Sequence, residues 1–153
     1  MLGMSSAHGD LIVPHDCAQL IFNLAPLSFI SSIVALCNGH TDIWIVPFSV
    51  GCTTLLFWTK PTYGWRRNTD ITISFLALMY QLYRIHVNNY HLSGYYICKA
   101  LAVLSYFTGH YYFARNRLWL SMYCHAGIHV FGNIGNVILY ITFPSASSPA
   151  SVH

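Results

Sequence analysis

The sequence contains very little charge. It has seven Lys and Arg and four Asp among 153 residues, and glutamate does not occur. Charged residues make up 7%, compared with roughly 25% in an ordinary soluble domain. A soluble domain of this size needs more solvated side chains to cover its surface. The 55% hydrophobic content and the mean hydropathy of +0.48 exclude intrinsic disorder. The composition therefore predicts an integral membrane protein.

Other absences exclude further classes. Seven basic residues are too few for a nucleic-acid-binding surface, so we expect no nucleic-acid partner. The five cysteines occur singly, which excludes a Cys-x-x-Cys zinc site and implies no disulfide framework. No Lys or Arg precedes the first apolar run, so the N-terminal segment is not typical of a cleaved secretory signal.

Apolar runs predict an all-α fold, a polytopic bundle of about five transmembrane spans. A span requires about 20 mostly apolar residues. The segments that qualify, the first of them interrupted by a proline, are Cys17–Cys37, Ile43–Thr59, Asp70–Tyr83, Gly94–Phe113 and Leu118–Phe143. We expect one helical domain over residues 1–143 and a disordered tail over residues 144–153.

The basic residues predict the orientation of this bundle. With five spans, the N-terminus and the second and fourth loops share one side, which carries Lys60, Arg66, Arg67, Arg115 and Arg117. The other side carries Arg84, and Lys99 is expected to extend toward that surface. Short basic loops stay in the cytoplasm, so we predict a cytoplasmic N-terminus.

The fifth span carries a stripe of polar residues. At 100° per residue, six of them fall within an arc of about 120°: Ser121, His125, His129, Asn133, Asn136 and Tyr140. His125 and His129 are about one turn apart, a spacing that suits two ligands of one metal ion. Hydrogen bonds between helices would explain the same stripe as packing.

The third span carries a second stripe, on an arc of about 80°: Asp70, Ser74, Ala77, Gln81 and Arg84. Asp70, Gln81 and Arg84 are expected to neutralise and hydrogen-bond one another. Asp70 lies in the first turn, where a helix N-terminus stabilises a carboxylate, so a capping role is a simpler alternative.

Depth decides whether the two stripes can share a site. His125 and His129 lie about 10 and 16 Å from the cytoplasmic start of their span. Asp70 and His110 lie near the same side, so these groups can converge, although His110 is also typical of an interfacial residue. The remaining histidines are expected in loops or at chain ends without a role: His8, His15, His40, His86, His91 and His153.

The order of these residues resembles the membrane hydrolase superfamily that contains the alkaline ceramidases and the adiponectin/progestin receptors, often called CREST. Its members carry Ser and His near the end of the second helix, Asp at the start of the third and His-x-x-x-His on the last. Here Thr54 stands at the serine position, Asp70 at the aspartate position, and His125 and His129 at the final pair. The resemblance implies zinc bound by three histidines, with Ser and Asp holding the zinc water for hydrolysis of a lipid amide.

Two departures from that pattern concern the metal and the fold. Trp58 occupies the first histidine position and cannot bind zinc, and five spans replace seven. A zinc ion would therefore need Asp70 or His110 as a third ligand beside His125 and His129. Such a site would supply a hydroxide nucleophile.

Three functions follow as alternatives. The leading one is a multi-pass membrane protein that is a non-catalytic, divergent relative of these hydrolases and acts through membrane lipids or partner proteins. The second is a zinc-dependent lipid amidase, in which His125, His129 and Asp70 bind the metal and Thr54 or Ser74 orients the water. The third is a proton or ion conductor. The oligomeric state and the organelle stay open.

Overall fold

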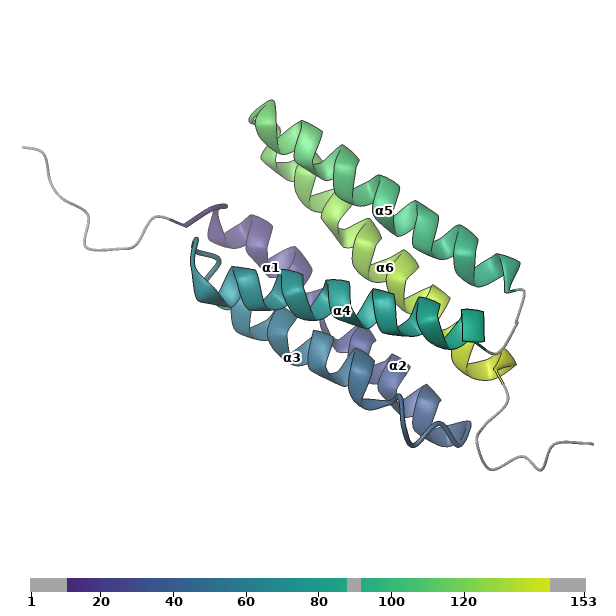
Figure 1. The fold of residues 1–153 in the computed structure, drawn as a ribbon. Coiled ribbons are helices and arrows are strands. Elements are labelled where there is room, and N and C mark those ends of the chain that lie inside the picture. Colours follow the sequence, from purple (N-terminus) through teal and green to yellow (C-terminus); the bar gives the residue numbers. More distant parts are fainter. Residues whose placement is uncertain (1–10, 88–91, 144–153) are drawn as a thin grey trace, which may run out of the picture.

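The computed structural model describes residues 11–87 and 92–143, and that part of the chain consists of helices without a β-strand (Figure 1). The all-α prediction is confirmed. The predicted tail, residues 144–153, lies outside the described residues. The helices are α1 (His15–Leu24), α2 (Pro26–Cys37), α3 (Ile45–Trp58), α4 (Trp65–Val87), α5 (Ser93–Ala114) and α6 (Leu118–Thr142).

Helices α1 and α2 form one rod that is interrupted at Pro26. Ala25 between them keeps helical dihedral angles, with φ −54° and ψ −34°, and its N–H donates to the Ile21 carbonyl over 3.1 Å. Proline has no N–H to continue this bonding, which accounts for the interruption. The rod His15–Cys37 is long and apolar enough to cross a membrane, the one such helix among the described residues; the apolar helix Ile45–Trp58 is shorter.

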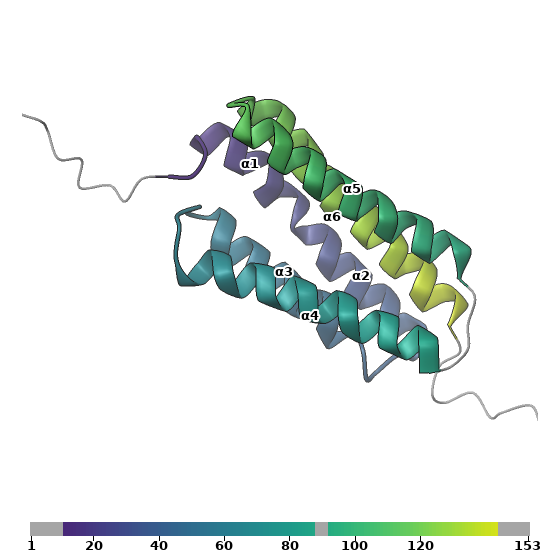
Figure 2. The same ribbon diagram turned by 45° about the horizontal axis from the view of Figure 1, so that its top comes forward.

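The remaining helices form two antiparallel hairpins, α3–α4 and α5–α6, with the α1–α2 rod between them (Figure 2). Within each hairpin the two helices pack along each other, and the rod packs against α3 on one side and α6 on the other. Among the described helices, α4 packs extensively only against α3. The rod therefore joins the two hairpins into one bundle.

Each end of the bundle is closed by specific turn residues. The α3–α4 and α5–α6 turns lie at the same end as the start of α1 (Figure 1). Gly64 with φ +141° and Asn116 with φ +57° allow these reversals. At the other end, an ion pair between Arg84 and Asp42 links α4 to the α2–α3 turn. The prediction that Arg84 pairs with Asp70 is therefore wrong, because Asp70 lies near the opposite end of α4.

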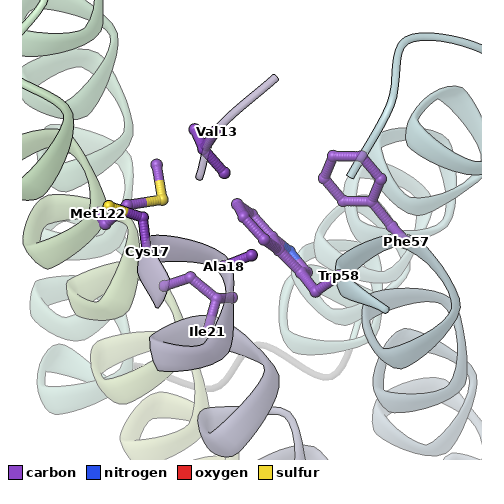
Figure 3. Packing of buried hydrophobic residues seen from close by; sticks show 7 residues of the cluster. All are labelled: Val13, Cys17, Ala18, Ile21, Phe57, Trp58 and Met122. Carbon is purple, nitrogen blue, oxygen red and sulfur yellow. The ribbon is translucent and has the colours of Figure 1, made fainter. Parts of the chain in front are cut away.

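Two hydrophobic clusters lie toward the two ends. The first joins α1, the end of α3 and the start of α6 (Figure 3), and its members are Val13, Cys17, Ala18, Ile21, Phe57, Trp58 and Met122. The second contains Ile85, Tyr95, Leu139, Tyr140 and their neighbours. His40, expected without a role, is buried beside this second cluster, and its Nε2 lies 3.0 Å from the Tyr140 carbonyl oxygen.

Small residues bring α5 and α6 close together. A Cβ atom on Gly127 would lie 2.9 Å from Ser105 Oγ and 3.3 Å from Ser105 Cβ, so a side chain there requires the Ser105 hydroxyl to rotate away and the contact with α5 to widen slightly. A Cβ atom on Gly132, in the same helix, would meet nothing within 4 Å. Substitutions at Gly127 and Gly132 therefore distinguish the effect of close helix packing on stability from the effect of replacing a helical glycine by alanine.

We predict that Gly127→Ala lowers the free energy of unfolding by about 1 kcal/mol, because the added methyl group overpacks the α5–α6 contact. Gly132→Ala is the matched control and is expected to be neutral or slightly stabilising, since alanine favours a helix. Unfolding of both variants in detergent, followed by circular dichroism, measures the difference. Equal stability of the two variants would contradict the close packing.

Candidate functional site

A cavity of about 410 Å³ lies between the two hairpins, with α4 on one wall and α5 and α6 on the other. Among the residues proposed from the sequence, Asp70, Ser74, His125 and His129 line it. A smaller cavity of about 120 Å³ is lined by Trp58, Asp70 and His125 among others. Because Asp70 and His125 line both, the two cavities adjoin at these side chains.

The polar stripe of α6 faces into the bundle, as its periodicity predicted. His129, Asn133 and Asn136 are each about nine-tenths buried. Asn133 joins α6 to α2, since Ser31 Oγ donates to Asn133 Oδ1 over 2.7 Å. Ser121 Oγ donates to the Gly109 carbonyl of α5 over 2.9 Å. Part of the stripe therefore has the packing role that the sequence left open.

Asp70 and Gln81 of α4 bond to different helices and not to each other. Gln81 Nε2 donates to Tyr140 Oη over 3.0 Å, and Gln81 Oε1 accepts from Tyr95 Oη over 3.2 Å. Asp70 bonds to α3 instead, which corrects the expected Asp70–Gln81 pairing. Asp70 and Gln81 therefore join α4 to α3 and to the α5–α6 hairpin, respectively.

Asp70 accepts two hydrogen bonds from the end of α3. Thr53 Oγ1 and Thr54 Oγ1 both donate to Asp70 Oδ1, over 3.0 and 3.1 Å. Thr54 is fully buried, so Asp70 is the partner that satisfies its hydroxyl group. The two residues that the sequence paired as Ser-like and Asp positions are therefore in contact, while Ser74 lines the large cavity about one turn further along α4.

Trp58, His125 and His129 form a row of rings. The centroids of Trp58 and His125 are 4.9 Å apart with an interplanar angle of 63°, and those of His125 and His129 are 5.4 Å apart. Trp58 Nε1 and His129 Nε2 are buried without a hydrogen-bond partner among the described residues. An unpaired buried polar atom is costly, so these two nitrogens are the unsatisfied polar groups of the row.

The zinc centre that the resemblance implies needs three ligands, and the described residues do not provide them. Within residues 11–87 and 92–143, no group of three or more His, Cys, Asp or Glu side chains is placed to hold a metal ion. Trp58 packs against His125, with ring centroids 4.9 Å apart. His110 is exposed, packs on Tyr106 of its own helix with ring centroids 4.4 Å apart, and lines the smaller cavity together with Asp70 and His125.

Lys99 is the cavity residue that the sequence interpretation placed wrongly. It does not extend to the surface, because Nζ donates to Asn136 Oδ1 over 2.7 Å and to the Gly132 carbonyl over 3.1 Å. Its stem passes beside Gly135, where a Cβ atom would lie 3.4 Å from Lys99 Cε. The signal was present in the sequence as Asn136 next to a glycine on the polar face of the fifth span.

Comparisons of the chain with protein-family models, with curated proteins and with solved structures find no match.

We predict that Thr54→Val lowers the free energy of unfolding by about 1.5 kcal/mol, because it removes a buried donor to the Asp70 carboxylate. Thr108→Val is the matched control: Thr108 is exposed and donates only to the Leu104 carbonyl one turn back in its own helix. Thermal unfolding in detergent compares the two. A loss of the same size in both variants would show that the α3–α4 contact contributes nothing specific.

Proposed function

We propose that the chain is a multi-pass membrane protein that binds an amphiphilic ligand in its central cavity without catalysing a reaction. Two features support the proposal. Many large apolar side chains are exposed and several polar ones are buried, which is the reverse of a soluble protein. Trp58, which packs against His125, stands at the position where the resemblance implies a metal ligand. The second feature carries the functional part of the proposal.

The reversed distribution supports a membrane environment. Large apolar side chains point outward, including Phe75, Ile97 and Phe107 at 59%, 60% and 65% exposure. Polar side chains such as Ser31 and Gln81 are instead 0% and 2% exposed. Monomeric soluble proteins rarely expose such continuous apolar faces, whereas helices in lipid keep polar groups inside the bundle.

Helix lengths suit membrane crossing for the α1–α2 rod, α4, α5 and α6, whereas α3, the second span of the proposal, is shorter with 14 residues. Helices α4, α5 and α6 have 23, 22 and 25 residues. At about 1.5 Å per residue they reach across a hydrocarbon core of about 30 Å. Lys60, Arg66, Arg67, Arg115 and Arg117 fall at or near the turns of one end, which would face the cytoplasm with the N-terminus.

We predict that the N- and C-termini lie on opposite sides of the membrane, because five spans cross it an odd number of times. Reporter fusions or glycosylation acceptor sites placed at either terminus of the full chain measure this. A modified C-terminus with an unmodified N-terminus is expected. Both termini on the same side would contradict the five-span arrangement.

The cavity suits an amphiphile because its two sides differ. Ile71, Phe75 and Val103 line it and are also 43%, 59% and 43% exposed, so its mouth lies between α4 and α5. In a membrane this mouth would open toward the acyl chains. The opposite side is lined by polar side chains of α6, His129, Asn133 and Asn136. A ligand with a hydrocarbon tail and a polar head would satisfy both sides.

Trp58 supports binding over hydrolysis. Its indole is part of the first hydrophobic cluster and packs edge-on against His125, so the position serves packing and supplies an N–H donor in place of a metal ligand. The imidazoles of His125 and His129 are two ligands, whereas a catalytic zinc site uses three protein ligands. The zinc-dependent amidase is the competing proposal, and metal content separates the two.

We predict that the purified protein holds no stoichiometric zinc and that Trp58→His gains it, because the variant adds a third imidazole beside His125 and His129. Elemental analysis after dialysis against a weak chelator measures this. Trp58→Phe is the matched control, since it alters the packing without adding a ligand. Stoichiometric zinc in the wild type that is lost in His125→Ala/His129→Ala would favour the amidase and overturn the binding proposal.

A further inference from the structure

We propose that Lys99 is the anion-binding residue of the central cavity, and that the ligand is an amphiphile with a negatively charged head group. This inference rests on the proposed binding function and specifies its ligand. It concerns a residue outside the Thr54, Asp70, His125 and His129 set, and it follows from how Lys99 is held and from the charges around it.

The Lys99 ammonium group is fixed inside the cavity by α6. Two of its three donors are directed to Asn136 Oδ1 and the Gly132 carbonyl, and Nζ lies 5.1 Å from the centre of the Tyr95 ring. Asn133 and Asn136 line the cavity beside it. One N–H donor is thus left for a ligand, in a setting whose other groups are uncharged amides, carbonyls and an aromatic face.

No carboxylate of the described residues forms an ion pair with Lys99. The chain has four acidic residues, and Asp10 lies outside the described part. Asp42 pairs with Arg84, and Asp16 is exposed in the first turn of α1. Asp70 lines the same cavity but bonds to α3, eleven residues before Gln81, whose partner Tyr95 lies one turn before Lys99. A half-buried ammonium group inside a membrane is expensive when its partners are all neutral, and a negatively charged ligand would lower that cost.

The position of Lys99 determines what kind of anion fits. It is the seventh residue of α5, so its Cα lies about 9 Å from the start of that helix. A head group held there is within the proposed span, and the mouth between Phe75 and Val103 directs the rest of the ligand toward the lipid. A single hydrocarbon chain with a carboxylate or phosphate head meets these conditions, whereas a soluble polar anion has no use for the apolar mouth.

The experiment measures binding of labelled amphiphiles to the full chain in nanodiscs of zwitterionic lipid. A long-chain carboxylate and an alkyl phosphate of equal chain length are compared with the corresponding alcohol. We expect the wild type to bind one or both anionic probes about tenfold more tightly than the alcohol. The carboxylate and phosphate arms identify which head group is preferred.

Lys99→Met is expected to abolish the preference for the anionic probes over the alcohol, and Lys99→Arg is expected to keep it. Lys60→Met is the matched control, because Lys60 is an exposed lysine at the α3–α4 turn, away from the cavity. Equal wild-type binding of alcohol and anions, or a preference that survives in Lys99→Met, would overturn the role of Lys99. Absence of binding for every probe would instead overturn the proposed binding function. If Lys99→Met does not fold, the wild-type comparison of anion with alcohol decides.

Discussion

The buried hydrogen bonds of Gln81 determine how the two hairpins are held. Its side-chain amide joins Tyr95 of α5 and Tyr140 of α6 to α4, and all three side chains are buried. Because α4 otherwise packs extensively only against α3, these bonds fix its far end relative to the other hairpin. In an apolar environment each unmade bond would be costly, so the three groups hold together. The space between Gln81 and Asp70 is then left as the cavity.

The sequence predicted the helices well because their apolar runs and their breaks are local signals. Pro26 interrupts the first predicted span, as expected, and Gly64 and Asn116 lie in the connections between predicted spans. The largest error concerns α4, which was expected over Asp70–Tyr83 and extends over Trp65–Val87. Hydropathy falls at the arginines near both ends, but backbone hydrogen bonding does not depend on hydropathy, so the helix continues through them.

The sequence was enough to predict which helix faces form the candidate site, but not which hydrogen bonds its residues make. Helical periodicity is enough to predict which side of α6 faces inward and that Thr54 and Asp70 lie at a similar depth. It does not give the partner of each group, which depends on helix rotation and on side-chain conformation. Asp70 therefore bonds to α3 and not to Gln81, and Lys99 turns toward α6 and not toward the surface.

The position of charge in the cavity explains how Trp58 and Lys99 fit one function. A metal centre would place positive charge at the row of rings, where Trp58 instead contributes an apolar surface and one N–H donor. In the proposed binding function the positive charge belongs to Lys99, whose partner Asn136 lies seven residues, or about 10 Å, beyond His129 along α6. An anionic head group would therefore bind at Lys99. The unpaired nitrogens of His129 and Trp58 would meet neutral polar groups of the ligand or water, a task that requires hydrogen bonding and no metal.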